Sequence, residues 1–262
     1  MMNHHPDADF LLALAAGNLE NGPSLVVSSH VEGCAVCQER IRVLEMIGGD
    51  MLEALEPAVL ATDALTQTLA AIDSPMPPAY QPPTAMGLRA KLPIGMKWPR
   101  ALHGCTTTRW RWLGPGMRWS RVTLPYDSAA NVFLLRIGAG KKLPMHTHDG
   151  VELTQVLYGT FHDGRALFGP GDFDEADGSI FHQPVVLAEG ECICLASVRG
   201  KVMFEGAIAR WFGGLVGMYK NRCDAADFFN YKKSSSCDEI ADPRCDPASS
   251  CRRYGSSESA PT

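Results

Sequence analysis

Three residues near the N-terminus have types and spacing suited to binding a transition metal. His30, Cys34 and Cys37 form the pattern HxxxCxxC. If one helix ends near His30 and the next begins near Cys34, two cysteines three residues apart lie on one side of the first helical turn. The positive end of the helix dipole favours the thiolate form that a metal ligand requires. Thiolate and imidazole ligands together favour zinc.

The HxxxCxxC motif supplies only three of the four ligands that a tetrahedral structural zinc site requires. His4 and His5 precede the first predicted helix, and a helical hairpin would bring that segment back beside the end of the second helix. The residues alone leave both histidines as candidates. The alternative interpretation is two buried thiols and an incidental histidine, without a metal.

A second set of metal-ligand residue types lies in the C-terminal half. His146 and His148 are two residues apart and therefore share one face of a predicted strand. A tight turn at Asp149-Gly150 would return Glu152 to that face from the next strand. His182, on a further predicted strand, would complete the set. Such ligands suit Zn, Fe, Mn or Ni, and the alternative is a strand histidine pair that binds no metal.

The elements that must position the first set are helical. Apolar residues between residues 7 and 73 recur at helical spacing and predict three or four short helices. Asp9 and Ser24 are the expected N-caps. Glycines are expected to separate the helices, at positions 17, 33 and 48–49.

The second set lies in a region with the pattern of strands. Five prolines within residues 73–84 predict an extended linker. Between about residues 110 and 213, short runs rich in β-branched and aromatic residues predict a sandwich or barrel. The segment RWRWLGPGMRW is interpreted as an edge strand rather than a nucleic-acid surface, because phosphate binding needs a wider basic field.

Length, composition and cysteine usage limit the class of protein. The chain has 262 residues, 45% of them hydrophobic, which is ordinary for a globular protein of two folded units. No apolar run approaches the roughly 18 residues of a membrane span, and the N-terminus lacks signal-peptide features, so the cytoplasm is expected. Nine cysteines are then expected to be thiols or metal ligands rather than disulfides. Four of them lie after Gly214, in a segment too poor in aliphatic residues to form a core.

The net charge of −5 is distributed unevenly. Residues 1–73 contain two basic and eleven acidic side chains, a formal charge of −9, which leaves +4 for the rest of the chain. A segment this acidic repels nucleic acid and favours a basic partner, such as a protein that itself binds nucleic acid. The alternative is an acidic helical surface that serves only solubility.

The motifs also carry a family resemblance. Residues 140–159 match the first cupin motif, whereas the second motif is matched only by His182, without its usual PxGxx approach and later asparagine. Together with HxxxCxxC, the sequence resembles ChrR-type zinc-binding anti-sigma factors over residues 4–213. The resemblance implies an α+β multidomain fold, in which a small N-terminal helical zinc-binding bundle is joined by a Pro-rich linker to a cupin double-stranded β-helix. Together with the proline run and the change in composition after Gly214, this gives the expected limits of 1–73 for the helical domain, 74–85 for the linker, 86–213 for the cupin and 214–262 for a disordered tail, which has no counterpart in the family.

The resemblance also implies the ligands of both metal sites. In this family a histidine upstream of HxxxCxxC completes the first zinc site, and His5 fits that spacing best. The first set is then His5, His30, Cys34 and Cys37. The second set is His146, His148, Glu152 and His182, with zinc expected ahead of Fe, Mn or Ni.

The function implied by the resemblance is regulatory. Such a protein binds and inhibits a group IV (extracytoplasmic-function) sigma factor in the cytoplasm. Its cupin domain is expected to sense stress, oxidative stress and singlet oxygen in particular, and to release the sigma factor. Cys192 and Cys194 alternate on one predicted strand and are candidate redox sensors, although cysteine also serves as a small core residue. No catalytic residue, nucleic acid or membrane partner is expected. The alternative is a metal-dependent cupin dioxygenase or isomerase with a regulatory helical head.

Overall fold

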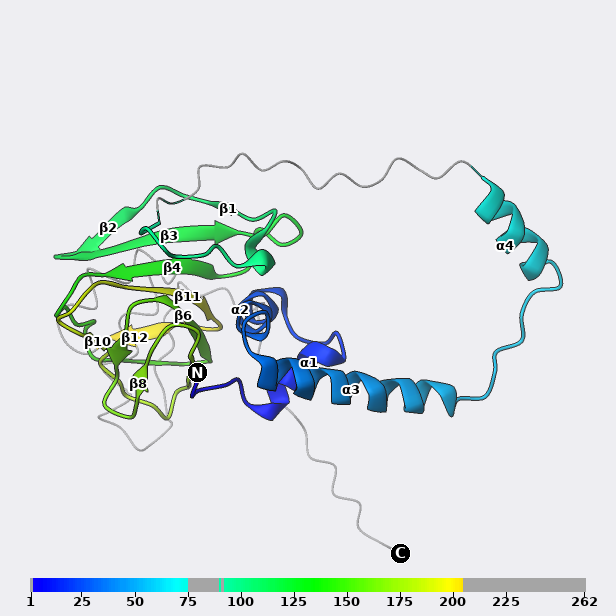
Figure 1. Ribbon diagram of the computed structural model, residues 1–262, viewed down its shortest axis with the longest axis horizontal. Coiled ribbons are helices and arrows are strands. Elements are labelled where there is room, and N and C mark those ends of the chain that lie inside the picture. Colours follow the sequence, from blue (N-terminus) through cyan, green and yellow to red (C-terminus); the bar gives the residue numbers. More distant parts are fainter. Residues whose placement is uncertain (1, 75–89, 91, 205–262) are drawn as a thin grey trace, which may run out of the picture. The chain divides into compact units, whose positions relative to one another are not determined.

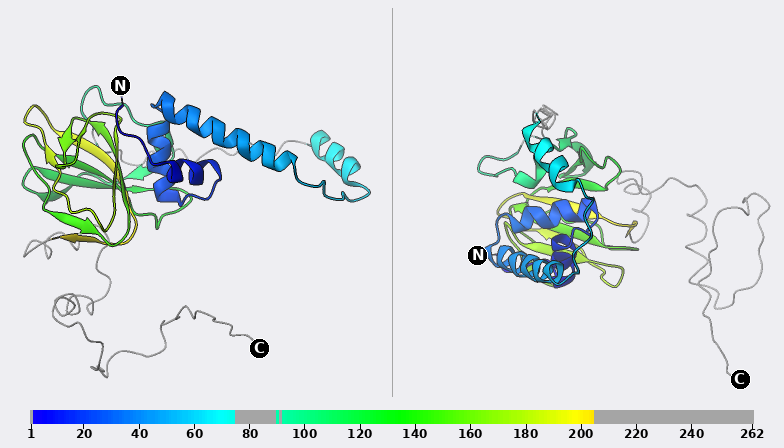
Figure 2. Two further views of the ribbon diagram at one scale, coloured as in Figure 1. Left: turned by 90° about the horizontal axis from the view of Figure 1, so that it is seen from below. Right: turned by 90° about the vertical axis from the view of Figure 1, so that its right-hand side faces the viewer.

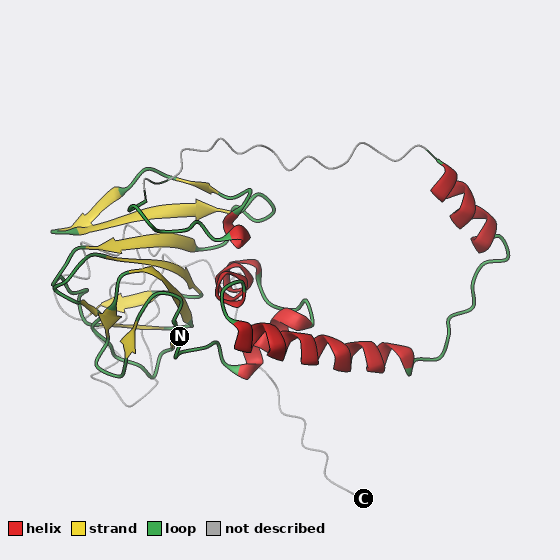
Figure 3. Ribbon diagram, viewed as in Figure 1, coloured by secondary structure: helices red, strands yellow, loops and turns green. Residues whose placement is uncertain are grey.

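The computed structural model describes residues 2–74, 90 and 92–204 of the chain. Its N-terminal part contains four helices, namely α1 (Ala8–Ala15), α2 (Asn21–Val31), α3 (Ala35–Glu53) and α4 (Ala64–Asp73). A 3-10 turn η1 (Arg100–Leu102) and strands follow (Figures 1 and 3). We call residues 2–73 the head and residues 99–204 the barrel. None of the helices in the described part of the chain has the length and apolar character to cross a membrane.

The helix boundaries differ from prediction at three places. The N-cap residues are Asp7 for α1 and Glu20 for α2, so the expected caps Asp9 and Ser24 are wrong and lie inside the first turns. An acidic residue in a first turn still interacts favourably with the helix dipole, which explains the ambiguity at Asp9. Gly17 and Gly33 do separate helices, but α3 continues through Gly48 and Gly49. Glycine costs about 1 kcal/mol inside a helix, which is too little to end one that other residues favour.

The barrel is built from three sheets within the described residues. The largest has the order β1-β3-β4-β11-β6-β9, with β2 also paired to β3; the others are β10-β7-β8 and β12-β5. The strands are β1 (Thr106–Thr107), β2 (Arg111–Gly114), β3 (Met117–Thr123), β4 (Val132–Ile137), β5 (His146–His148), β6 (Glu152–Tyr158), β7 (Phe161–His162), β8 (Leu167–Phe168), β9 (Phe173–Ala176), β10 (Val185–Val186), β11 (Cys192–Val198) and β12 (Val202–Phe204). The arginine and tryptophan segment forms β2, the predicted edge strand, and continues into the start of β3, with which β2 pairs. The expected linker beyond Ser74 and the expected tail lie outside the described residues.

One hydrophobic core joins the head to the barrel. On α2, Leu25, Val26 and Val27 are buried among barrel residues that include Leu134 and Leu195. Helix α2 lies against β6 and β11, as two directions of view show (Figures 1 and 2). Burying side chains of this size contributes about 1.5–3 kcal/mol each. The docking of α2 is therefore a substantial part of the stability of the fold.

Two further groups strengthen this junction. The Glu32 carboxylate, inside the HxxxCxxC motif, accepts hydrogen bonds from the backbone N–H groups of Arg100, at 2.8 Å, and Ala101. It thereby occupies the exposed donors at the start of η1. Cys105, to which the sequence assigned no role, is buried in the shared core, and burial raises the pKa of its thiol. Cys105 is a core residue.

Candidate metal centres

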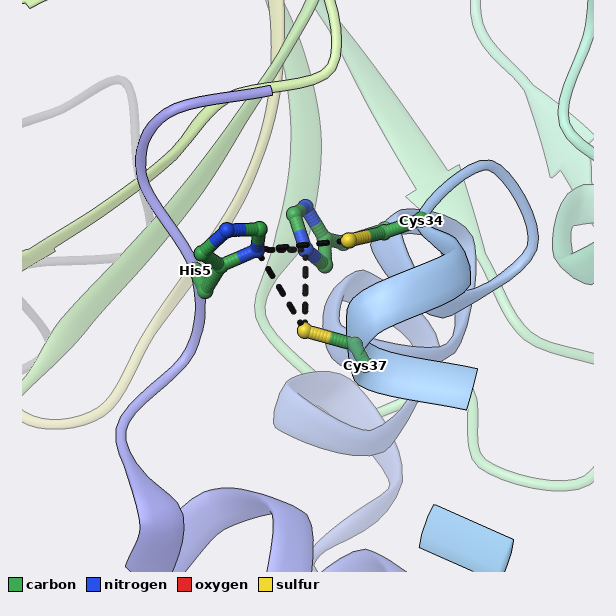
Figure 4. A group of neighbouring side chains, drawn as sticks. His5, Cys34 and Cys37 are labelled. Carbon is green, nitrogen blue, oxygen red and sulfur yellow. Dashed lines mark hydrogen bonds between the residues drawn. The ribbon is translucent and has the colours of Figure 1, made fainter. Parts of the chain in front are cut away.

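The head brings together the four residues predicted as its metal ligands. His30 is the next-to-last residue of α2, Cys34 is the N-cap of α3, and Cys37 lies in the first turn of α3. His5 comes from the extended segment before α1. The side chains of His5, Cys34 and Cys37 point toward one another (Figure 4). We call these four residues the head centre.

The distances within the head centre are those of atoms that can share one ion. Nδ1 of His5 lies 3.2 Å from Sγ of Cys34, 3.5 Å from Sγ of Cys37 and 3.4 Å from Nε2 of His30. Nε2 of His30 lies 3.4 Å from Sγ of Cys37. All four ligand atoms lie within 4.8 Å of one another. Two sulfurs and two imidazole nitrogens form a donor set that suits structural zinc.

The electrostatics of the head centre also fit a cation. Burial lowers the pKa of His30, so its imidazole is neutral and can offer a lone pair. Burial and the neighbouring Cys34 raise the pKa of Cys37 to about 12, so without a cation this thiol would stay protonated. A bound cation reverses this preference, because metal binding releases thiol protons. The neighbouring His4 is directed elsewhere, with its ring centroid 4.6 Å from that of Phe168.

The barrel brings together the second predicted set, which we call the barrel centre. Nε2 of His182 lies 3.0 Å from Nε2 of His146 and 3.5 Å from Nε2 of His148, and Nε2 of His148 lies 2.9 Å from the Glu152 carboxylate. The three histidine side chains are at most 5% exposed and that of Glu152 is 15% exposed. Converging imidazole nitrogens cannot all be satisfied by one another, since each neutral ring has a single donor. A cation between them resolves this conflict.

The ionisation states in the barrel centre are those of a ligand set. Burial alone would raise the pKa of Glu152, but the neighbouring imidazoles of His146 and His148 hold that pKa well below its usual range. Burial, together with the nearby His146, lowers the pKa of His182 to about 4. The centre at neutral pH therefore contains a carboxylate and a neutral His182. Both are the forms that bind metal.

The route by which Glu152 reaches the barrel centre differs from prediction. Strand β5 pairs with β12, whereas β6 pairs with β11 and β9, so Asp149-Gly150 does not make a hairpin between β5 and β6. The chain instead crosses there from the small sheet to the large one. At this crossing the chain passes close to the backbone of Arg199. This explains Gly150, because an added Cβ would clash with the carbonyl oxygen of Arg199. His182 also lies outside a regular strand and forms an isolated bridge with His146.

A third cluster was not found from the sequence. Asp163, Asp174 and His182 place ligand-type atoms within 4.8 Å of one another, and all three residues are buried. Arg165 forms ion pairs with both carboxylates. The alternation of Asp172 and Asp174 in GDFDEADG indicates only that these two carboxylates would share one face of a strand. Nothing local in the sequence indicated that Asp163 would meet them.

Cys192 and Cys194 lie side by side, as their alternation on one strand predicts. Their sulfurs are 3.7 Å apart on β11, and both are buried in the apolar core of the barrel. A hydrogen bond with Cys192, together with burial, raises the pKa of Cys194 well above its usual value. The surroundings of both thiols are those of small core residues.

Comparison with known proteins identifies the family. A family model described as the ChrR cupin-like domain matches residues 99–200. The anti-sigma-E factor ChrR of Cereibacter sphaeroides is 35% identical over 213 residues, which cover 80% of this chain and 95% of that protein. This chain belongs to the ChrR family.

A solved structure of a ChrR protein has the same fold. The crystal structure of Rhodobacter sphaeroides SigE in complex with the anti-sigma ChrR matches with a TM-score of 0.61 and 31% identity, covering 76% of this chain and 100% of that one. The predicted combination of a helical N-terminal region with a cupin barrel is therefore confirmed for this chain. The assignment of metal to the two centres remains a prediction.

Proposed function

We propose that this protein is an anti-sigma factor, whose head binds a group IV sigma factor in the cytoplasm and keeps it from core RNA polymerase. The observation that carries the proposal is a set of exposed apolar side chains on the acidic head. A relative named as an anti-sigma-E factor, and a solved complex of SigE with ChrR, support it.

The first part of the proposed binding surface lies on α3. Val43, Met46, Ile47 and Met51 are between 45% and 68% exposed. Their spacing places them on one side of the helix. Nearer the start of α3, Ile41 and Leu44 are partly buried against the core. A helix whose apolar residues are packed at its start and exposed further along is suited to a partner that covers the exposed ones.

Helix α4 provides a second apolar stripe. Leu65, Leu69 and Ile72 recur at helical spacing and are between 53% and 72% exposed. None of the ten residues of α4, all of them described, is buried. Helices shorter than about 12–15 residues are marginal in water without tertiary contacts. We infer that the partner covers this stripe and stabilises α4.

The charge of the head complements the expected partner. A protein that binds promoter DNA presents basic surfaces, and a segment with a charge of −9 attracts them. In such an interface the apolar contacts supply most of the affinity, whereas charge sets rate and choice of partner.

An exposed apolar residue on each part of the molecule gives a matched test. Ile47→Asp on α3 is expected to weaken binding of a candidate sigma factor by about tenfold or more and to relieve inhibition of in vitro transcription. Leu167→Asp, which places the same charge at a residue of β8 that is 55% exposed, is expected to change neither. Equal effects of the two substitutions, or inhibition that depends on the barrel alone, would contradict the proposal.

We propose zinc for both centres, held by the head centre and by the barrel centre as defined above. Zinc would supply a structural cross-link between His5, α2 and α3 in the head. Elemental analysis of the full chain is expected to give two equivalents. One equivalent of zinc would contradict the proposal for one of the two centres. The zinc content of the variants Cys34→Ser and His148→Ala would then show which centre holds the metal.

We further propose that the barrel receives an oxidative signal that releases the sigma factor. The sulfurs of Cys192 and Cys194 form a pair in the barrel core, which supports testing them as the redox element. The double variant Cys192→Ser and Cys194→Ser is expected to reduce oxidant-induced release. Unchanged release would leave these cysteines as core residues only. The dioxygenase or isomerase alternative is less well supported, because neither the HxxxCxxC motif nor the acidity of the head serves dioxygen chemistry.

A further inference from the structure

The barrel supplies the groups that orient His30 of the head centre. Nδ1 of His30 lies 2.8 Å from the carbonyl oxygen of Gly171, to which it donates a hydrogen bond when the ring is protonated at that nitrogen. The ring of Phe173 meets His30 edge to face, with centroids 5.6 Å apart. A hydrogen bond at one ring nitrogen fixes the tautomer and directs the other nitrogen toward the ligand position.

The same stretch of the barrel holds the segment that carries His5. The Asp172 carboxylate accepts hydrogen bonds from the backbone N–H groups of Asn3, at 2.6 Å, and His4, at 3.1 Å. The N–H of Phe173 donates to the carbonyl oxygen of His4 at 3.2 Å. On the other side of His5, the Glu175 carboxylate accepts from the N–H of Asp7 at 2.8 Å. Residues 171–175 therefore position both histidines of the head centre.

Asp163 occupies the position of an orienting carboxylate for the barrel centre. Its Oδ2 lies 3.8 Å from Nδ1 of His182, a buried nitrogen without a hydrogen-bond partner in the described part of the chain. The other carboxylate oxygen accepts from the N–H groups of Arg165 and Ala166. Carboxylates placed behind metal-binding histidines orient the ring and raise its basicity. Asp163 is thus a positioning residue for His182.

Arg165 connects these two arrangements. Its guanidinium donates at 2.6 Å to Asp163 and at 2.6 Å to Asp174, and at 3.1 Å to the carbonyl oxygen of Glu175. Two buried carboxylates need a cation, and Arg165 provides it, so the third cluster requires no metal of its own. One side chain therefore links the loop behind His182 to the strand that holds the His5 segment.

We propose that Arg165 and strand β9 couple the two metal centres, so that an occupied barrel centre tightens metal binding in the head. Ordering of His182 fixes Asp163, Asp163 and Asp174 fix Arg165 and β9, and β9 fixes the His5 segment. The inference rests on the proposed metal sites and adds the route between them. Coupling between binding sites is reciprocal, so metal in the head tightens the barrel centre by the same factor.

Cobalt(II) is the probe for the test, because thiolate ligands give it an absorption band that the sulfur-free ligand set of the barrel centre does not. The full-length metal-free chain is titrated with Co²⁺ against a chelator, and Cys34→Ser verifies that the band belongs to the head centre. Removing the barrel centre by His148→Ala is expected to lower head-centre affinity about fivefold or more. Arg165→Lys loses the guanidinium fork. In chains that carry Arg165→Lys, head-centre affinity is therefore expected to be the same with and without His148→Ala.

Two further variants complete the design. Arg136→Lys alters an equivalent fork, which Arg136 makes with Glu191 elsewhere on the barrel, and is expected to keep the difference. Asp163→Asn, in which the side chain keeps nearly the same shape, is expected to abolish the difference in head-centre affinity. It replaces Arg165→Lys in the test if circular dichroism shows that Arg165→Lys is unfolded.

The outcomes separate the coupling from the proposed metal sites. Equal head-centre affinity with and without the barrel centre overturns the coupling, while both sites stand. A difference that persists in Arg165→Lys and Asp163→Asn overturns the route. Absence of the thiolate band, or one bound equivalent in the unaltered chain, overturns a metal site itself and the coupling with it.

Discussion

Two adjacent histidines near the N-terminus have different surroundings. His5 faces His30 and both cysteines of the head centre, whereas the ring of His4 packs on Phe168. Sequence spacing alone left both as candidates, because a one-residue shift in an extended segment reverses the direction of a side chain. The backbone hydrogen bonds from Asn3 and His4 to Asp172 decide which of them faces the cysteines.

This difference predicts unequal effects of two alanine substitutions. His5→Ala is expected to lower zinc affinity of the head centre by about tenfold or more, because it removes a ligand, and even outer groups contribute about 10–100-fold. His4→Ala is the matched control and is expected to leave affinity within about twofold. Chelator competition measures both. Equal losses would contradict the assignment of His5, rather than His4, as the fourth ligand.

Glu175 predicts a pH-dependent stability. Burial raises the pKa of Glu175 to about 7, so the folded chain holds this proton at a pH where the unfolded chain has lost it. Stability from the protonated form is complete below the unfolded pKa and is lost as pH rises through about 7. Glu175→Gln is therefore expected to raise the free energy of unfolding at pH 8 by about 1–2 kcal/mol, allowing for partial exposure. At pH 5, where Glu175 is protonated in the folded chain, the gain is expected to be smaller.

Urea unfolding of the metal-free chain at both pH values measures the effect. Glu189→Gln, in an exposed turn, is the control. A gain for Glu175→Gln that is the same at pH 5 and pH 8 would rule out titration of Glu175 as its cause.

Among the elements, α2 and α3 use glycine differently. At Gly22, in the first turn of α2, an added Cβ would lie 2.7 Å from Oγ of buried Ser197 and 3.3 Å from a methyl group of Val132. At Gly49, inside α3, nothing lies within 4 Å of the added atom. One glycine permits close packing on the barrel, whereas the other only weakens a helix.

The two glycines predict opposite stability changes. Gly22→Ala is expected to lower the free energy of unfolding by about 1–3 kcal/mol, because α2 must move away from β11. Gly49→Ala is expected to raise it by about 0.5–1 kcal/mol where α3 contributes to the cooperative unit. Thermal or urea unfolding compares them. Stabilisation by Gly22→Ala would show that α2 does not pack closely on the barrel.

At the scale of the whole molecule, the opposite charges of the head and the remainder predict salt-dependent association. The association rate with a sigma factor is expected to fall by roughly tenfold as ionic strength rises from about 0.01 M to about 0.15 M, because screening shortens from about 30 Å to about 8 Å. Dissociation, governed by apolar contacts, is expected to change less. Stopped-flow or surface binding kinetics measure both rates.

A neutralised head tests the origin of this salt dependence. The triple variant Glu45→Gln, Asp50→Asn and Glu53→Gln removes three charges from the exposed end of α3 and is expected to flatten the dependence. An unchanged slope would assign the steering to another part of the chain.

The sequence by itself determined the ligand types, the helical and β regions and the family. HxxxCxxC and HxH are short-range patterns, in which spacing along one helix turn or one strand fixes relative direction. The charge of −9 on residues 1–73 is likewise a property of the sequence alone. These features could be predicted because each depends on neighbours within a few residues.

Only the tertiary structure decided how the head and barrel meet. The contacts of Asp172 with Asn3 and of His30 with Gly171 join residues more than 140 positions apart, and nothing local encodes them. The burial of α2, the crossing at Gly150 and the meeting of Asp163 with His182 have the same origin. Chain folding brings such groups together through packing of whole elements, so their partners appear only when the core is assembled.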